Sequence, residues 1–190
     1  MVNKLNNVFL IGPMGSGKTT IGKKLANKAE KKFYDTDEEI KKNTGADIPL
    51  IFEIEGDSGF REREKKIISK LVLLNNIVLS TGGGVILDEE NRNMLADNGL
   101  VIYLKSSAEK IYKRTSGDKS RPLLQGNDRL GKIKEILAER ESIYASIADE
   151  VVETDILGTS EILQKILKLI NKYENSKSYF KGQNVFHIHW

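Results

Sequence analysis

The sequence predicts a three-layer α/β/α domain whose sheet is mainly parallel and has about five strands. Short apolar runs, typical of strands that are covered on both faces, recur along the chain. Segments with the apolar spacing of amphipathic helices separate these runs, so strands and helices alternate. In such folds ligands bind at the carboxyl ends of the strands, and we expect the functional residues to gather there.

The expected elements follow in chain order. Strands are predicted at residues 8–11, 32–34, 77–80, 100–104 and, more weakly, 150–153. Asp47 is predicted to cap a helix that has Pro49 in its first turn, and Ser58 to cap a second helix that runs through Val72. Further helices are predicted after residue 18 and at residues 108–115, 128–147 and 160–173.

Length and composition limit the class of protein. The 190 residues suffice for one domain, which we place at residues 1–173, with a tail at residues 174–190. The absence of cysteine excludes a disulfide framework, a thiolate nucleophile and a Cys-based zinc site. It fits a reducing compartment, and because residues 1–7 show neither a secretory signal nor a membrane span we expect a cytoplasmic protein.

The charge balance bears on partners. Lys and Arg number 30 against 27 acidic residues, a net charge of +3, which is too balanced to indicate nucleic-acid binding. We expect a monomer that binds small anionic molecules and neither nucleic acid nor membrane. His187 and His189 lie in the tail and are interpreted as tail residues rather than metal ligands.

The first motif follows the first predicted strand. Residues 12–19, GPMGSGKT, fit the phosphate-binding loop GxxxxGK[ST] between a strand and a helix. The glycines of this loop let backbone N–H groups converge on phosphate oxygens, and the dipole of the following helix favours an anion. The sequence therefore predicts a site for a nucleoside triphosphate.

Three further stretches are ambiguous when each is considered alone. Asp35 and Asp37 either cap a helix or point into the site toward a metal and an acceptor hydroxyl. Arg61 lies in the first turns of a predicted helix, where a cation without an anionic partner is unfavourable. The triple glycine at residues 82–84 indicates either a sharp turn or a close approach of a ligand to the backbone.

The loop at residues 116–128, SGDKSRPLLQGND, has the composition of a mobile lid and equally that of an ordinary surface connection. The stretch LAERESIY, which contains Arg140, reads in isolation as a helical face of ion pairs.

Together these motifs resemble one family. The combination of GPMGSGKT, DTD, GDSGFR, STGGG, RPLL and a late Arg, over about residues 8–173, is similar to shikimate kinases. These are P-loop kinases related to nucleoside-monophosphate kinases. The resemblance implies transfer of the ATP γ-phosphate to the 3-hydroxyl of shikimate, a step of chorismate and aromatic amino-acid biosynthesis. It also implies a substrate-binding region at about residues 35–64 and a lid at about residues 115–127.

The resemblance assigns roles on the nucleotide side. Lys18 would neutralise the transferred phosphate, and Thr19 and Asp35 would hold Mg²⁺. Arg114 would stack on adenine, and Arg121 of the lid would stabilise the developing charge. The implied nucleotide-binding set is Gly12, Gly15, Ser16, Gly17, Lys18, Thr19, Thr20, Arg114 and Arg121.

The resemblance also assigns the acceptor side. Asp37 would orient the attacking hydroxyl, and Arg61 and Arg140 would bind the shikimate carboxylate. Glu64 would hold Arg61 in place. The implied catalytic residues are Lys18, Asp37 and Arg121, and the implied substrate-binding residues are Asp37, Arg61, Gly82, Gly83, Gly84 and Arg140.

Two positions depart from the family pattern. Asp57 stands where a Glu is common, and residues 151–161 lack the usual proline of the adenine loop, so no base contact is assigned there. The rival interpretations are a related small-molecule kinase that acts on gluconate or a nucleoside monophosphate, and an inactive P-loop protein that binds nucleotide and regulates a partner. The presence of Lys18, Thr19, Asp35 and Arg121 argues against the second.

Overall fold

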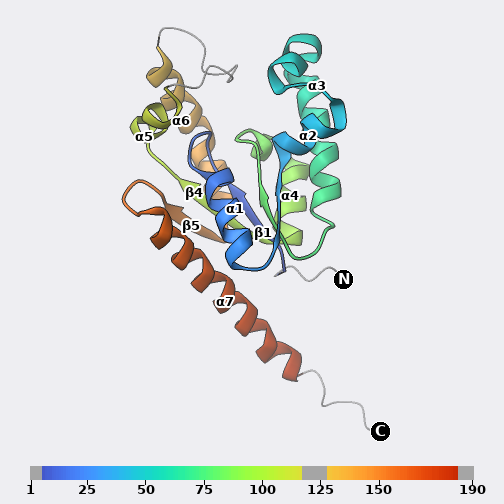
Figure 1. Ribbon diagram of the computed structural model, residues 1–190, viewed down its shortest axis with the longest axis vertical. Helices are drawn as coiled ribbons and strands as arrows, with labels where there is room; N and C mark the ends of the chain where they lie inside the picture. Colours follow the sequence, from blue (N-terminus) through green and yellow to red (C-terminus); the bar gives the residue numbers. More distant parts are fainter. Residues whose placement is uncertain (1–5, 117–127, 184–190) are drawn as a thin grey trace.

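The computed structural model describes residues 6–116 and 128–183, with burial of side chains given as far as residue 174. A five-stranded, fully parallel sheet forms the centre, in the order β2-β3-β1-β4-β5 (Figure 1). The strands are β1 (Val8–Ile11), β2 (Lys32–Asp35), β3 (Ile77–Ser80), β4 (Leu100–Lys105) and β5 (Glu150–Glu153). The predicted fold class and all five strands are confirmed.

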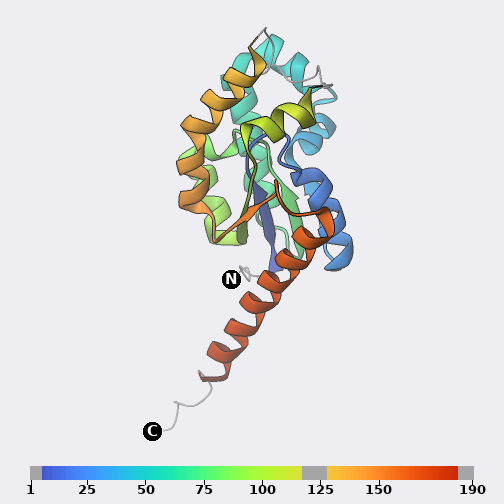
Figure 2. The same ribbon diagram turned by 90° about the vertical axis from the view of Figure 1, so that its left-hand side faces the viewer.

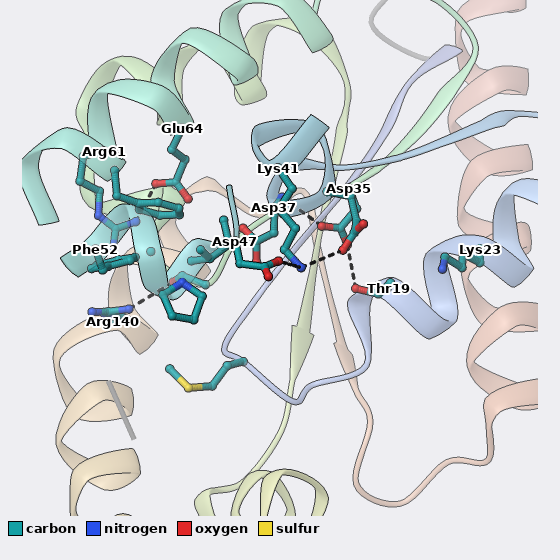
Figure 3. Close-up of a pocket in the computed structure, with 18 residues that line it drawn as sticks. Thr19, Lys23, Asp35, Asp37, Lys41, Asp47, Phe52, Arg61, Glu64 and Arg140 are labelled. Carbon is teal, nitrogen blue, oxygen red and sulfur yellow. Dashed lines mark hydrogen bonds and ion pairs between the residues drawn. The ribbon is translucent and has the colours of Figure 1, made fainter. Parts of the chain in front are cut away.

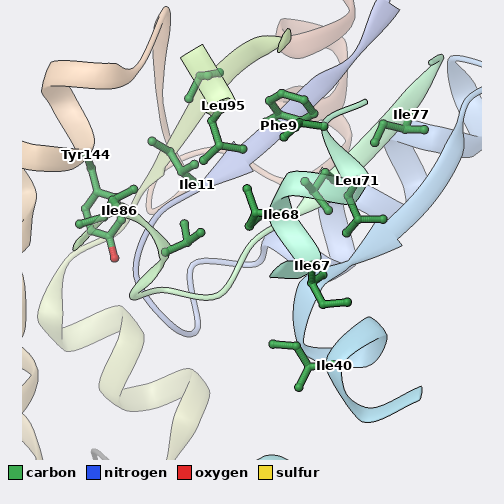
Figure 4. Close-up of a cluster of buried hydrophobic side chains, with 14 of the residues drawn as sticks. Phe9, Ile11, Ile40, Ile67, Ile68, Leu71, Ile77, Ile86, Leu95 and Tyr144 are labelled. Atoms are coloured by element: carbon green, nitrogen blue, oxygen red, sulfur yellow. The ribbon is translucent and has the colours of Figure 1, made fainter. Parts of the chain in front are cut away.

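Alternation along β1 explains why the sheet is covered on both faces. Phe9 and Ile11 enter one buried cluster, which Figure 4 shows, and Val8 and Leu10 enter a second cluster on the opposite face. Successive side chains of a strand point to opposite faces, so a strand without polar residues requires two covering layers. The carboxyl end of β1 leads directly into the glycine-rich loop, which is thereby anchored in the middle of the sheet.

Helices supply the two covering layers. One face carries α1 (Lys18–Lys28) and α7 (Thr159–Gln183), and the other carries α3 (Ile48–Leu71), α4 (Glu89–Asn98) and α6 (Arg129–Ile147). Two shorter helices complete the fold: α2 (Thr36–Thr44) follows β2 directly and packs on α3, and α5 (Ala108–Thr115) follows β4 and packs on α6. A short 3₁₀ turn, η2 (Val85–Leu87), follows the triple glycine.

The third helix differs from the prediction at its start and in its middle. Asp47 precedes α3, but its side chain makes no capping hydrogen bond and lies 3.6 Å from Lys41 Nζ instead. The break within α3 falls at Gly56, with φ 69° and ψ −172°, so the prediction that Ser58 caps the second half is wrong. Gly56 tolerates this left-handed conformation without a steric cost, and it therefore fixes the kink two residues before Ser58.

The last helix is longer than predicted. It continues to Gln183, beyond the expected end at Tyr173, and Figures 1 and 2 show it projecting away from the sheet. No proline or glycine interrupts residues 159–181, so nothing in the local sequence stops the helix at residue 173. Within the described part of the chain, no helix combines the length and the apolar character that crossing a membrane would require.

Candidate active site

The phosphate-binding loop connects β1 to α1 in the predicted way. Gly12 and Gly17 have φ of 139° and 98°, a conformation that side chains strongly disfavour, and Gly17 is the N-cap residue of α1. Lys18 is buried, and its Nζ donates to the Gly12 and Pro13 carbonyls at 2.7 and 2.8 Å. These bonds fold the lysine back over the loop, beside a pocket of about 470 Å³ that the loop lines.

Asp35 serves as both a cap and a site residue, so the two interpretations of the Asp pair are compatible. Its Oδ1 accepts from the backbone N–H of Asp37 at 3.1 Å and caps α2. Its Oδ2 accepts from the Thr19 hydroxyl at 2.8 Å, and Ser80 Oγ lies 3.4 Å from the same hydroxyl. The sheet order explains why Asp35, Thr19 and Ser80 lie together, because β2, β3 and β1 are neighbours and their carboxyl ends lie at one edge of the sheet.

These oxygens form a donor set that fits Mg²⁺. Mg²⁺ is typically held by one or two carboxylates together with substrate phosphates, rather than by a complete protein cage. No group of three or more His, Cys, Asp or Glu side chains suited to a metal occurs among the described residues. Thr19 and Asp35, next to a phosphate-binding loop, therefore offer the kind of partial site that this metal uses.

A second pocket, of about 510 Å³, lies beside the first (Figure 3). Arg61 points into it from α3 and is already paired, with Nη1 2.7 Å from Glu64 Oε2 and Nη2 3.3 Å from Asp57 Oδ1. Arg61 therefore has anionic partners within the protein itself. The expectation that Glu64 holds Arg61 in place is met by the structure.

Glu64 is an unusual feature of this pocket. Its side chain is 1% exposed, and burial raises its pKa to about 7 although Arg61 acts in the opposite direction. Its Oε1 and the Arg61 Nε are buried, and neither has a hydrogen-bond partner among the described residues. Buried polar groups usually find such partners, so these two atoms mark a site built to receive a ligand or water.

Arg140 reaches the same pocket from α6. Its side chain is buried, and Nη1 donates to the Gly83 carbonyl at 3.4 Å. Within the described ranges it forms no ion pair, whereas its exposed neighbour Glu141 pairs with Lys105. The interpretation of Arg140 as part of a helical face of ion pairs is therefore wrong. Figure 3 shows Arg61 and Arg140 converging on one end of the pocket from two elements.

The triple glycine forms a turn and also permits a close approach. The Val85 N–H donates to the Gly82 carbonyl at 3.3 Å, and the Gly82 N–H donates to Thr36 Oγ1 at 2.8 Å. A Cβ atom at Gly82 would lie 2.7 Å from Glu64 Oε1, and one at Gly84 would overlap the Arg61 guanidinium. The glycines make room for the protein's own charged side chains, and none of the three has a positive φ.

The two pockets share one wall. Met14, Thr19, Asp35, Asp37, Gly82 and Gly83 line both. The predicted nucleotide-binding residues from Gly15 to Thr20 line the first pocket, and the predicted acceptor residues Arg61, Gly84 and Arg140 line the second. Phosphoryl transfer requires a donor and an acceptor to meet in line, and the shared wall provides that meeting point.

Arg114 borders the first pocket at its outer end. Its guanidinium donates to the Gly15 carbonyl at 3.3 Å and to the Thr154 carbonyl at 3.1 Å, which links the phosphate-binding loop to the segment after β5. Leu157 and Thr159 of that segment line the same pocket. Arg121, like most of the predicted lid, lies outside the described residues.

Sequence reasoning missed several residues that line or support the second pocket. Phe52 and Phe60 stack with ring centroids 4.6 Å apart across the kink of α3, and with Ile48 and Pro49 they give the pocket an apolar side. Tyr144 of α6 donates its hydroxyl to the Gly83 carbonyl in a short hydrogen bond. Aromatic residues at helical spacing suggest core packing, so the sequence alone carried no sign of either role.

Comparison with known proteins decides the family. The family model described as shikimate kinase matches residues 14–171, which is most of the chain. The chain belongs to the shikimate kinase family. The match contains the phosphate-binding loop from Met14 onward, both Asp residues, the triple glycine and Arg140.

Relatives and solved structures agree with this membership. The chain is 49% identical to a shikimate kinase of Nitrosococcus oceani, over 88% of each protein. It is 50% identical to one of Legionella pneumophila, over 88% of this chain and 95% of that protein. A shikimate kinase structure from Acinetobacter baumannii in complex with shikimate superposes with a TM-score of 0.85 at 42% identity, covering 88% and 93% of the two chains.

Proposed function

We propose that this chain transfers the γ-phosphate of ATP to the 3-hydroxyl of shikimate, which yields shikimate 3-phosphate and ADP. One observation carries the proposal: a phosphate-binding loop pocket and a pocket with two arginines, Arg140 buried and Arg61 partly buried, share a wall that contains Thr19, Asp35 and Asp37. Membership of the shikimate kinase family gives the acceptor its name. The product then serves chorismate and aromatic amino-acid biosynthesis.

The chemistry of shikimate matches the second pocket. The molecule carries a carboxylate at one end of a cyclohexene ring and hydroxyls at the other. Arg61 and Arg140 would bind the carboxylate, the apolar side at Phe52 and Phe60 would face the ring, and Asp37 would accept from the hydroxyls. The solved relative from Acinetobacter baumannii, a complex with shikimate, supports this pairing.

On the nucleotide side, backbone N–H groups of residues 15–19 would bind the phosphate oxygens. Lys18 would leave the loop carbonyls to neutralise charge on the transferred group. Thr19 and Asp35 would hold Mg²⁺, which when bound supplies neutralisation of the triphosphate charge. Arg114 would stack on adenine, and Arg121, outside the described residues, keeps its proposed role over the phosphates.

On the acceptor side, Asp37 acts chiefly by orientation. The transition state of phosphoryl transfer is loose and places little demand on a base, so holding the attacking hydroxyl in line is the larger contribution. The N–H groups of Gly83 and Gly84 would contact the same ligand, since these glycines line the pocket between Arg61 and the phosphate-binding loop, whereas the Gly82 N–H is bound to Thr36. A monomer in the cytoplasm is the expected working form.

The test is ADP release from Mg·ATP with shikimate, gluconate or a nucleoside monophosphate as the acceptor. We expect strong stimulation by shikimate alone. Stimulation by gluconate or by a nucleoside monophosphate instead would reassign the acceptor. No stimulation by any acceptor, together with tight ATP binding, would favour the inactive nucleotide-binding protein.

A further inference from the structure

We propose that Tyr144 is a positioning residue of the acceptor site: by holding the Gly83 carbonyl, it leaves the Arg140 guanidinium available for the substrate carboxylate. The inference deepens the proposed function and rests on it, because it concerns how shikimate is bound. It starts from a carbonyl oxygen that receives two donors from the same helix.

Arg140 and Tyr144 lie one helical turn apart on α6 and face the same way. The Tyr144 hydroxyl makes a short hydrogen bond to the Gly83 oxygen, whereas Arg140 Nη1 lies 3.4 Å from that oxygen. A contact of 3.4 Å is at the outer limit for an N–H donor, so Tyr144 is the principal partner of this carbonyl. Arg140 is held near the loop without being committed to it.

The Arg140 guanidinium lies against the Tyr144 hydroxyl, and one of its donors, the Nε, is unused within the described part of the chain. Its Nε is buried without a hydrogen-bond partner, and no carboxylate of the described residues lies within ion-pair distance of it. A buried cation without an anion is costly, so a ligand carboxylate would gain from binding there. Without the Tyr144 hydroxyl, the Gly83 oxygen would lose its main donor. Arg140 would then move toward that oxygen and away from the ligand.

The hydrogen bond from Tyr144 to Gly83 is important because of where Gly83 lies. Gly83 lines both pockets, and a Cβ atom on it would lie 3.2 Å from the Met14 backbone nitrogen, so its peptide packs against the phosphate-binding loop. The Tyr144 ring lies in the buried cluster (Figure 4). There it stacks on Tyr103, with the ring centroids 5.0 Å apart. Burial raises the pKa of Tyr144, which keeps the hydroxyl protonated as a donor.

The test compares two variants that each lose one hydroxyl from the same aromatic stack. Tyr144→Phe removes the donor to Gly83, and Tyr103→Phe is the matched control, because no hydrogen bond among the described residues involves its hydroxyl. We expect Tyr144→Phe to raise the KM for shikimate about tenfold and the KM for ATP less than about twofold. Tyr103→Phe should change neither, and melting temperatures check that both variants fold.

A double-mutant cycle that combines Tyr144→Phe with Arg140→Met shows whether Tyr144 acts through Arg140. Tyr144→Phe should add less than about twofold to the shikimate KM in the Arg140→Met background, since the group it positions is absent. Methyl shikimate, which lacks the carboxylate, should likewise bind the wild type and Tyr144→Phe alike. Full additivity, or an equal loss with the ester, would overturn the inference.

The wild-type assay separates the two proposals. A wild-type protein that does not phosphorylate shikimate would reject the proposed function. A wild-type protein that does, with a Tyr144→Phe variant whose shikimate KM is unchanged, would reject the role of Tyr144 alone.

Discussion

The two pockets are built in opposite ways. The nucleotide pocket has one continuous segment, residues 14–21, in its lining, and a loop of this kind binds phosphate chiefly through backbone N–H groups. The acceptor pocket is assembled from charged side chains on α2, α3 and α6 and from the loop after β3. A site made of backbone is fixed by a local motif, whereas a site made of side chains depends on contacts between distant segments.

This contrast predicts that substitutions on the two sides fail differently. The nucleotide side should lose turnover, since its side chains are proposed to act on the transferred phosphate. The acceptor side should lose affinity for shikimate, since its side chains are proposed to bind a group remote from the reaction.

The largest effect is expected from Lys18→Ala. The variant removes the cation that would neutralise the transferred phosphate, together with two hydrogen bonds to loop carbonyls, so kcat should fall by at least about a thousandfold. Steady-state ADP release measures this, with Lys24→Ala, an exposed lysine on the same helix, as the control. A folded Lys18→Ala protein that keeps its activity would contradict the assignment of the loop.

Arg61→Ala should raise the KM for shikimate about a hundredfold and that for ATP less than about threefold, because it removes a proposed cationic partner of the carboxylate. Initial rates with each substrate varied in turn measure the split. Arg63→Ala is the matched control, since Arg63 pairs with Glu55 on the far side of the α3 kink and does not line the pocket. Equal losses for ATP and shikimate would show that Arg61 is not confined to the acceptor side.

Glu64→Gln tests how the ionisation of Glu64 in the acceptor pocket affects the pH dependence of the free energy of unfolding. The folded-state pKa of Glu64 is raised to about 7, so this group favours folding at low pH, and its contribution is lost as the pH rises from about 4.5 through about 7. Glu64→Gln should remove that loss, which amounts to up to about 3 kcal/mol of unfolding free energy.

Urea unfolding of wild type and Glu64→Gln at pH 5 and pH 8 provides the measurement. At pH 8 the free energy of unfolding of the variant should increase relative to that of the wild type. Identical pH dependence in the two proteins would mean that Glu64 is ionised throughout.

The smallest effect is expected from Asp155→Asn. Asp155 accepts from Ser106 Oγ at 2.6 Å and from the Ser107 N–H at 2.8 Å, and Ser106 Oγ lies 3.4 Å from Arg114 Nη1. Burial alone would raise the pKa of Asp155, but these hydrogen bonds lower it, so the group is a carboxylate in the neutral range. Asp155→Asn should weaken these hydrogen bonds and loosen Arg114. The KM for ATP should therefore rise about threefold, and the KM for shikimate should stay unchanged.

Rates at varied ATP measure the effect of Asp155→Asn, with Glu153→Gln on the exposed edge of β5 as the control. A change confined to the KM for shikimate would show that Asp155 does not support the nucleotide pocket.

The same contrast explains what the sequence could predict. The strands and the phosphate-binding loop were predictable because apolar runs and glycine spacing are local signals. Arg140 was different: exposed Glu139 and Glu141 flank it, and only the family resemblance indicated that it turns inward. The partners of Arg61 and Gly83 lie on other turns or other elements, so their contacts depend on packing that no local pattern contains.

The kink of α3 could be predicted only in part from the local sequence. Gly56 was visible as a helix breaker, yet a serine two residues later offered a competing cap. The side-chain capping rule failed here because the glycine conformation alone stops the first half of the helix and starts the second.

The shared wall has a consequence for inhibitor design. Because Thr19, Asp37 and Gly83 border both pockets, the two ligand positions are immediate neighbours, and one molecule with a nucleoside at one end and a cyclohexene carboxylate at the other could reach both. Joining two weak ligands replaces one bimolecular event by an intramolecular one, which raises affinity by about 10² to 10⁴ when the linker fits. Such a compound would have to satisfy this acceptor pocket as well as a phosphate-binding loop, and kinases that share only the loop would lack half of its binding site.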